Sequence, residues 1–513
     1  MGGDFSWHTA VGGNAPRVTT PVLPDWVVPL WQRFLRLSTG RVAFFGLSGW
    51  AGQSQILSEG WQRAKLTDGR MSADAVIGMG ADWALAAACL QEGGSFMWLI
   101  PGAATEAADR RREVETAFAA TAHLLEIALD GGWMAIIGWK GDRLPAGSLE
   151  VLMVSYLSAL VIMGGSETQL FETLKALRGN HVRADVSLSL RLDPAAYALV
   201  HCFGVYAPDK YEQIQQLPGK LVISTIYWDF SRTRGETILT IEILKQAATA
   251  AEAVERLDDW HAGLLGLTAE GREAAEDPPE KAQKMRAIFT NAAHLLPNGR
   301  REAEMLLGAL SLPDIPYTVV PNAALTERFL DASPEPFVTA FGLKDFVLCA
   351  GRIEPRKNQH MLIWALRDTG LPLVLVGRRI DADYERLCRR WAGDNVHFIP
   401  ELSPQMLASA YAAARVHAMP SWVETPGIAN LEAALAGCNL VVGNRAIETE
   451  YFGDLAYVCD PANWRSIRDA VTLAWQDPGT ERRQALRQRI LTHFTWSEPA
   501  RITAEVYHQV IAG

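Results

Sequence analysis

Short apolar runs alternate along most of the chain with longer segments in which apolar residues return every three or four positions. Runs of the first kind predict buried strands, and segments of the second kind predict amphipathic helices. The clearest strand candidates are Arg41–Phe45, Ala75–Gly78, Phe96–Ile100, Met134–Gly138, Leu152–Tyr156, Leu221–Ser224, Phe346–Cys349, Leu373–Val376 and Leu440–Val442. This alternation favours an α/β protein built on parallel sheets.

Polar segments that carry Gly, Pro or several charges interrupt the alternation and predict domain boundaries. They are residues 140–148, 268–284 and 326–345, of which the second is expected to be a solvated loop. A chain of 513 residues also exceeds what one hydrophobic core usually supports. We therefore expect three domains, at about 1–147, 148–330 and 331–513.

Charge and cysteine content narrow the classes of function. The net charge of −10 argues against a nucleic-acid partner, because contacts to a polyanion need a basic surface. The six cysteines show no C-x-x-C spacing, which predicts buried free thiols in a reducing compartment. The chain has no secretory signal pattern and no apolar run long enough to cross a bilayer, so a cytoplasmic location is expected. Peripheral contact with a membrane stays open.

The segment FVLCAGRIEPRKN, residues 346–358, carries the first chemical signal. A predicted strand ends just before Arg352, and Lys357 stands at the start of a predicted helix. Ligands of parallel α/β sheets bind at the carboxyl ends of strands. A guanidinium and an ammonium at that edge can together neutralise a diphosphate. Arg356 adds to this basic cluster, which favours a small anionic ligand; a solvated cationic turn is the alternative.

The segment PSWVETPGIANLEAALAGC, residues 420–438, carries the second signal. A Pro-Gly pair breaks the backbone ahead of a predicted helix, so the amides of Gly427–Ala429 would face an incoming phosphate. Glu424 lies before this helix and Glu432 within it. Two such carboxylates can accept hydroxyl hydrogen bonds from two different sugars of one ligand. Two ordinary solvated acids are the alternative.

Glu424 and Glu432 form an E-x7-E pair, and GRIEPRKN precedes it at the usual interval, so the chain resembles the family-4 retaining glycosyltransferases of the GT-B fold. Further segments keep the order of that family over roughly residues 148–510. They are GGSETQLFETLKAL (164–177), PYTVVPNAAL (316–325), LVLVG (373–377), NVHFIPELSP (395–404), AYAAARVHAMPSW (410–422) and FTWSEPARITAEVY (494–507).

The resemblance implies two Rossmann-like domains that face each other across a cleft. An additional α/β domain is expected at the N-terminus, outside the resemblance. The nucleotide sugar would lie mainly on the C-terminal domain, and the last helix, near residues 498–511, would cross back to the other one. Arg352 and Lys357 would hold the donor diphosphate, with Glu424 near the transferred sugar. The donor would also meet the carboxylate of Glu432 and the backbone of Gly164, Gly165, Gly427, Ile428 and Ala429.

The expected transfer needs neither a metal ion nor another cofactor. Preorganised cations stabilise the charge that develops on a departing diphosphate, so Arg352 and Lys357 can replace a divalent metal. The one D-x-D segment, Asp381-Ala382-Asp383, lacks an apolar strand immediately before it and is interpreted as the acidic start of a helix. Retention of configuration is implied by the resemblance. A same-face attack, in which the leaving phosphate takes the acceptor's proton, fits it.

The acceptor side is the least defined part of the site. Many relatives place a histidine after a strand facing the acceptor, where this chain reads STIYWD, residues 224–229. Tyr227 and Asp229 are therefore candidates for acceptor contacts. His201 follows an apolar run and is a weaker candidate, because a histidine there is more often a satisfied core residue. The acceptor class is a glycan, a lipid-linked sugar or a protein.

Two other functions stay open for this sequence. A catalytically degenerate GT-B protein would bind a nucleotide sugar or a partner without turnover. A GT-B sugar-nucleotide epimerase would need no acceptor. Residues 1–147 are expected to form an additional α/β domain of unknown role, for which docking or contact within a homodimer is favoured over phosphate binding.

Overall fold

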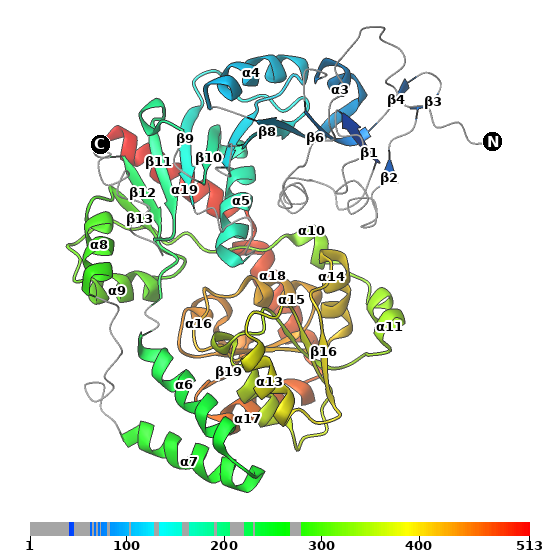
Figure 1. Ribbon diagram of the computed structural model, residues 1–513, viewed down its shortest axis with the longest axis vertical. Coiled ribbons are helices and arrows are strands. Elements are labelled where there is room, and N and C mark those ends of the chain that lie inside the picture. Colours follow the sequence, from blue (N-terminus) through cyan, green and yellow to red (C-terminus); the bar gives the residue numbers. More distant parts are fainter. Residues whose placement is uncertain are drawn as a thin grey trace. The chain divides into compact units, whose positions relative to one another are not determined.

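The computed structural model divides the chain into two compact units, Met1–Arg143 and Leu144–Gly513 (Figure 1). It describes residues 41–45, 62–63, 66–67, 70–71, 73–79, 83–101, 104–127, 133–155, 164–188, 192–205, 220–228, 231–266 and 279–513. No helix within these residues is both long and apolar enough to span a membrane.

The N-terminal unit contains a sheet in the order β2-β1-β5-β6-β8-β7. Its strands are β1 (Arg41–Phe45), β2 (Gln62–Arg63), β5 (Ala73–Met79), β6 (Leu90–Pro101), β7 (His123–Ile127) and β8 (Trp133–Trp139), with helices α3 (Trp83–Cys89) and α4 (Ala104–Ala117). Here the expectation of parallel strands holds for β2, β1, β5 and β6 only, because β8 runs antiparallel to both β6 and β7. The connection from β7 to β8 is too short for the crossover that parallel neighbours require.

The second unit begins with a wholly parallel sheet in the order β13-β12-β11-β9-β10. The strands are β9 (Leu149–Val154), β10 (Val182–Ser187), β11 (Leu199–Phe203), β12 (Leu221–Ser224) and β13 (His294–Leu296). Every residue of β11 and β12 is buried, which explains why these strands are apolar except for His201 and Ser224. Helices α5 (Gly165–Leu177), α8 (Pro279–Thr290) and α9 (Arg300–Ala309) belong to the same part of the chain.

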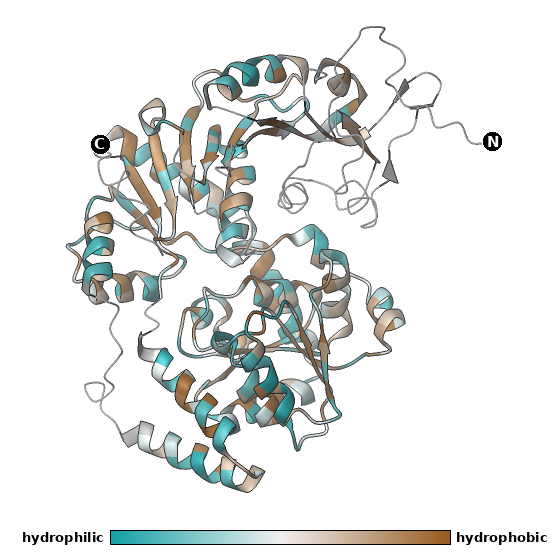
Figure 2. Ribbon diagram, viewed as in Figure 1, coloured by the Kyte–Doolittle hydropathy of each residue, from teal (hydrophilic) through white to brown (hydrophobic). Residues whose placement is uncertain are grey.

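A second parallel sheet follows, in the order β16-β15-β14-β17-β18-β19. It comprises β14 (Val347–Ala350), β15 (Leu373–Val376), β16 (Val396–Ile399), β17 (Val416–Met419), β18 (Asn439–Gly443) and β19 (Tyr457–Cys459). The strand order reverses between β14 and β17, and ligands of open α/β sheets bind at such a switch point. The buried strands are the most apolar parts of the ribbon (Figure 2).

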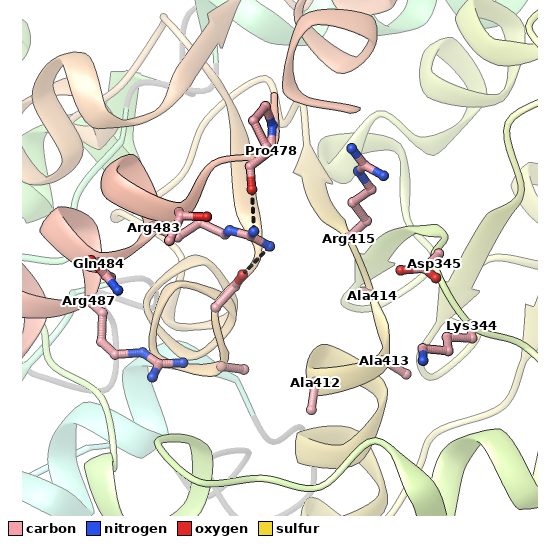
Figure 3. A pocket seen from close by; sticks show the side chains of 13 residues that line it. Lys344, Asp345, Ala412, Ala413, Ala414, Arg415, Pro478, Arg483, Gln484 and Arg487 are labelled. Atoms are coloured by element: carbon pink, nitrogen blue, oxygen red, sulfur yellow. Dashed lines mark hydrogen bonds between the residues drawn. The ribbon is translucent and has the colours of Figure 1, made fainter. Parts of the chain in front are cut away.

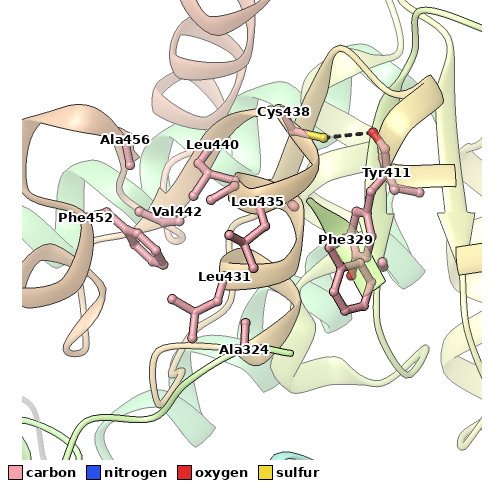
Figure 4. Packing of buried hydrophobic residues seen from close by; sticks show 14 of the residues in the cluster. Ala324, Phe329, Tyr411, Leu431, Leu435, Cys438, Leu440, Val442, Phe452 and Ala456 are labelled. Atoms are coloured by element: carbon pink, nitrogen blue, oxygen red, sulfur yellow. Dashed lines mark hydrogen bonds between the residues drawn. The ribbon is translucent and has the colours of Figure 1, made fainter. Parts of the chain in front are cut away.

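Helices cover both faces of this sheet. They are α12 (Gln359–Leu366), α13 (Ala382–Trp391), α14 (Pro404–Ala413), α15 (Ile428–Ala436), α16 (Glu448–Phe452), α17 (Trp464–Gln476) and α18 (Thr480–His493). Leu431 and Leu435 of α15 pack in one core cluster with Leu440 and Val442 of β18 (Figure 4). The other face holds a second cluster around Trp364. The α/β fold class predicted from the alternating pattern is confirmed.

Two helices from within residues 148–330 pack on the C-terminal sheet. They are α6 (Ser231–Gln246) and α7 (Ala250–Gly266), whose Leu244 and Leu257 share a buried cluster with Trp364. The indole Nε1 of Trp391 donates to the carbonyl of Leu244 at 2.9 Å. In the opposite direction, α19 (Ser497–Ala512) returns to pack against α5. The two halves of the second unit thus exchange helices.

Residues 279–284, which the sequence assigned to a solvated loop, begin helix α8 instead. Pro279 stands at the first position of this helix, where its missing N–H has no helical partner to lose. The rest of the predicted loop as far as residue 278 lies outside the described residues.

Candidate functional site

Lys357 and Glu424, both predicted as site residues, form a direct ion pair. Lys357 ends a single 3₁₀ turn after β14, and Glu424 lies in the loop after β17, so neighbouring strands bring them together. Both side chains are buried. Asn358 fixes the turn with a left-handed φ of 61° while its side-chain amide donates to the carbonyls of Pro420 and Pro461.

Arg356 is the residue that sequence reasoning did not assign to the site, although it lies in the basic cluster. Its Nη1 donates to the carbonyl of Val423 at 3.0 Å and lies 3.4 Å from each carboxylate oxygen of Glu424. Burial alone would raise the pKa of Glu424, but Lys357 and Arg356 together lower this pKa to about 2. Glu424 is therefore a carboxylate at every physiological pH and accepts hydrogen bonds only.

Arg352 joins the same network through Glu354. Its Nη2 lies 3.1 Å from Oε1 of Glu354, and Nη2 of Arg356 lies 3.0 Å from that oxygen. The result is a chain of alternating charges that runs from Arg352 through Glu354, Arg356 and Glu424 to Lys357. Three cations face two carboxylates, which leaves about one positive charge for an anionic ligand at the carboxyl ends of the strands.

The start of α15 is shaped by Gly427, whose φ of 85° few side chains tolerate. A β-carbon there would lie 2.8 Å from Cγ of Glu424 and 2.9 Å from Nδ2 of Asn430. The opposite half of the unit approaches this helix closely, because a β-carbon on Gly165 would lie 3.9 Å from Cδ1 of Ile428. The two predicted backbone segments of the donor site thus meet, one at the start of α5 and one at the start of α15.

The amide of Gly164 already has a partner. It donates to Oε2 of Glu167 at 2.8 Å, so Glu167 caps the start of α5 from its third position. The prediction that this amide contacts a phosphate therefore requires Glu167 to move aside. Ala429 lies in the first turn of α15, one residue after Ile428, as predicted from the Pro-Gly break.

Glu432 lies farther along α15, where it accepts a hydrogen bond of 3.2 Å from the hydroxyl of Tyr411. Burial raises the pKa of Glu432 to about 7, against the opposing effects of Arg328 and Tyr411. Glu424 and Glu432 thus have opposite electrostatic environments. Two cations lower the pKa of the first carboxyl, and burial raises the pKa of the second.

The histidine proposed for the acceptor side is part of the core. His201 contacts the hydroxyl of Tyr507 at 2.6 Å and Oγ of Ser224 at 2.9 Å, and it is buried. Burial lowers the pKa of His201 to about 3, so the ring stays neutral. It joins β11 to the returning helix α19, which corrects its assignment as a candidate for acceptor contact.

The loop after β12 is held by Glu302, a residue that the sequence analysis missed. Glu302 is buried, accepts from the backbone amides of Tyr227 and Asn298 at 3.0 Å each, and also accepts from the hydroxyl of Thr225. Burial raises its pKa to about 7 despite these donors. An acid three residues after Gly299 at a helix start is the signal that was available. Asp229, the other acceptor candidate, lies outside the described residues.

The D-x-D segment begins helix α13. Asp381 is its N-cap and accepts from the backbone amides of Asp383 at 2.9 Å and Tyr384 at 3.0 Å. Within the described residues, no group of three or more His, Cys, Asp or Glu side chains is arranged to hold a metal ion.

Comparison with known proteins matches residues 335–491 to the glycosyl transferases group 1 family. D-inositol 3-phosphate glycosyltransferase of Nocardia farcinica is 26% identical over 258 residues, which are 45% of this chain and 56% of that protein. The chain spans about half the length of the curated relatives it matches.

Solved structures support the fold at low sequence identity. Sucrose-phosphate synthase from Thermosynechococcus elongatus superposes with a TM-score of 0.55 at 16% identity, over 71% of this chain and 99% of that chain. Anabaena HepE in complex with UDP and glucose gives 0.52 at 16% identity, over 70% and 100%. Residues 335–491 therefore form a glycosyl transferases group 1 domain, within a second unit that has the GT-B fold.

Proposed function

We propose that this chain is a family-4, retaining glycosyltransferase that moves a sugar from a nucleotide diphosphate without a metal ion. The observation that carries the proposal is the buried pair of Lys357 and Glu424 at the switch point of a group 1 domain. HepE, a structural neighbour with the same fold, was solved with UDP and glucose, which favours a nucleotide sugar as the donor.

In this mechanism the bond between the anomeric carbon and the diphosphate oxygen breaks, and the diphosphate leaves with its electron pair. Lys357, Arg356 and Arg352 stabilise the negative charge that collects on the leaving group. Glu424 accepts hydrogen bonds from hydroxyls of the transferred sugar, because its low pKa keeps it ionised. The acceptor oxygen attacks from the face that the diphosphate leaves, and its proton passes to a phosphate oxygen.

The acceptor is a glycan, a lipid-linked sugar or a protein in this proposal. Glu302 orients the loop of Thr225 and Tyr227, which follows β12 at the carboxyl edge of the first sheet. A rigid loop at that edge is a suitable place for acceptor contacts. A hydroxyl acceptor is consistent with relatives such as D-inositol 3-phosphate glycosyltransferase.

The test is donor binding by the whole chain in EDTA. Thermal shift with UDP-, GDP-, ADP- and dTDP-sugars should raise the melting temperature with one nucleotide series, because a ligand that binds only the native state stabilises it. Lys357→Ala should lose this shift. Lys284→Ala, which removes an ammonium from a partly exposed i,i+4 pair on α8, should keep it. No shift with any donor at millimolar concentration would reject the proposal.

A second measurement distinguishes a glycosyltransferase from a protein that binds the donor without catalysis. Conversion of the stabilising donor is followed with glycan and lipid-linked acceptors and without an acceptor. Transfer with retained anomeric configuration supports the glycosyltransferase. Binding with no turnover identifies a degenerate donor-binding protein, and a new sugar nucleotide formed without acceptor identifies an epimerase.

A further inference from the structure

A basic hollow lies at the amino ends of the strands of the C-terminal sheet, whereas the Lys357–Glu424 pair lies at their carboxyl ends. Its volume is about 620 Å³, within the usual range for small-molecule sites. Lys344 precedes β14 and Arg415 precedes β17, whereas Lys357 and Glu424 follow those same two strands. Arg483 and Arg487 of α18 complete the basic lining (Figure 3). The hollow is therefore separate from the proposed donor site.

One of the four cations, Arg483, is held by hydrogen bonds to the backbone. Arg483 donates from Nη1 to the carbonyl of Gly437 at 3.4 Å and from Nη2 to the carbonyl of Pro478. Helices α14 and α15 both end at the hollow, and each helix C-terminus carries about half a negative charge. The charge of Arg483 offsets these two helix ends, so they do not account for the other cations.

Lys344, Arg415 and Arg487 form no ion pair within the described part of the chain. Arg415 lies over the ring of Trp475, with Cζ 5.3 Å from the centroid. Arg487 lies against Gly437, where a β-carbon would come within 3.1 Å of Nη2. Among the described residues, Asp345 is the one acidic residue that lines the hollow. Three cations against one carboxylate leave a surplus of about two positive charges in a concave surface, which focuses the field on an anion.

We propose that this hollow binds a small soluble anion that carries two or more negative charges, such as a phosphate ester or pyrophosphate. Guanidinium groups suit this ligand because their planar N–H donors match phosphate oxygens in pairs. Arg415 and Arg487 would supply those donors, and Lys344, which precedes the strand beside that of Arg415, would add a point charge. The three cations come from three separate elements, so the site requires the folded domain.

The experiment is calorimetric titration of the full chain with inorganic pyrophosphate at physiological ionic strength. Saturable binding is expected, and the double variant R415A/R487A should weaken it at least about tenfold. Asp345→Asn should tighten it about threefold, because it removes the one negative side chain. Asp345 has a φ of 53°, a conformation in which asparagine is favoured, so this variant should fold. Arg386→Ala, a largely exposed arginine on α13, should leave the affinity unchanged.

Several results would overturn the proposal. Heats that do not saturate would indicate a diffuse atmosphere of ions. Binding that survives in R415A/R487A but is lost in Lys357→Ala would assign the anion to the donor site alone. If Arg386→Ala weakens pyrophosphate binding as much as R415A/R487A does, the binding depends only on the net charge of the protein. A missing cooperative thermal transition in R415A/R487A would mean that this variant does not fold. The affinity of Asp345→Asn for pyrophosphate is then the test, and an unchanged affinity rejects the site.

Discussion

The ammonium of Lys357 and the carboxylate of Glu424 meet across β14 and β17, two adjacent strands that are far apart in sequence. Arg356 lies 3.4 Å from the same carboxylate, so one acid is shared by two cations. This arrangement holds the cations in place before any ligand arrives, which is the condition for electrostatic stabilisation of a leaving diphosphate. The stability of the domain should therefore depend on the charges of Lys357 and Glu424.

Lys357→Met should destabilise the protein by about 3 kcal/mol, because it leaves Glu424 buried with a single, more distant cation. Urea unfolding measures this change. Lys245→Met removes an exposed ammonium that pairs with Glu242 at 3.1 Å, and it should change the free energy of unfolding by less than about 0.5 kcal/mol. A double-mutant cycle with Glu424→Gln should give a coupling energy above about 1 kcal/mol. Additive effects would mean that the pair does not contribute.

The pKa of Glu424 also predicts a pH dependence. Its folded value of about 2 lies below the ordinary value of 4.5, so its stabilising effect is complete above about pH 4.5. The effect is lost as the pH falls through 2, and amounts to about 3 kcal/mol at most. Unfolding of the wild type should therefore become easier between these pH values. Glu424→Gln should be less stable at pH 7 and show a smaller decline; an identical pH profile would contradict the assignment.

Nine of the strands were predictable because they contain short apolar runs, and β12 and β14, for example, are wholly buried. Strands such as β10 and β16 were not among the candidates, because polar residues interrupt their sequences. Lys357 and Glu424 were predictable because spacing within two motifs marks them. Arg356 was not assigned, since nothing in its local sequence distinguishes it from the neighbouring Arg352. Only the packing of β14 beside β17 directs its guanidinium to Glu424.

Long-range contacts account for the other differences. His201 has its nearest partner on α19, 306 positions away, and no local pattern reveals that Tyr507 satisfies its ring. Glu302 likewise bonds to Thr225, 77 positions away. The position of α6 is likewise fixed by distant residues, because the carbonyl of its Leu244 accepts from the indole Nε1 of Trp391, 147 positions away.

Tyr507→Phe should cost about 1 kcal/mol, because it removes the hydrogen bond to a buried imidazole and leaves that ring nitrogen without its partner. Thermal unfolding measures the loss. The melting-temperature shift induced by the stabilising nucleotide sugar should stay as large as in the wild type, since the contact lies on β11 and α19 and away from Lys357. A selective loss of donor binding would mean that the contact between His201 and Tyr507 supports the donor site.

Gly427→Ala should impair both stability and donor binding. The φ of 85° is strained for alanine, and its β-carbon would lie 2.8 Å from Cγ of Glu424, so the Glu424 side chain must shift from its position in the ion pair. We expect a loss of about 2 kcal/mol and at least tenfold weaker donor binding. Gly342→Ala is the matched control, because its φ is 68° but a β-carbon there meets nothing within 4 Å. That control should show backbone strain of about 1 kcal/mol with unchanged affinity. Equal effects of the two substitutions on donor binding would mean that the position of Glu424 does not matter for the ligand.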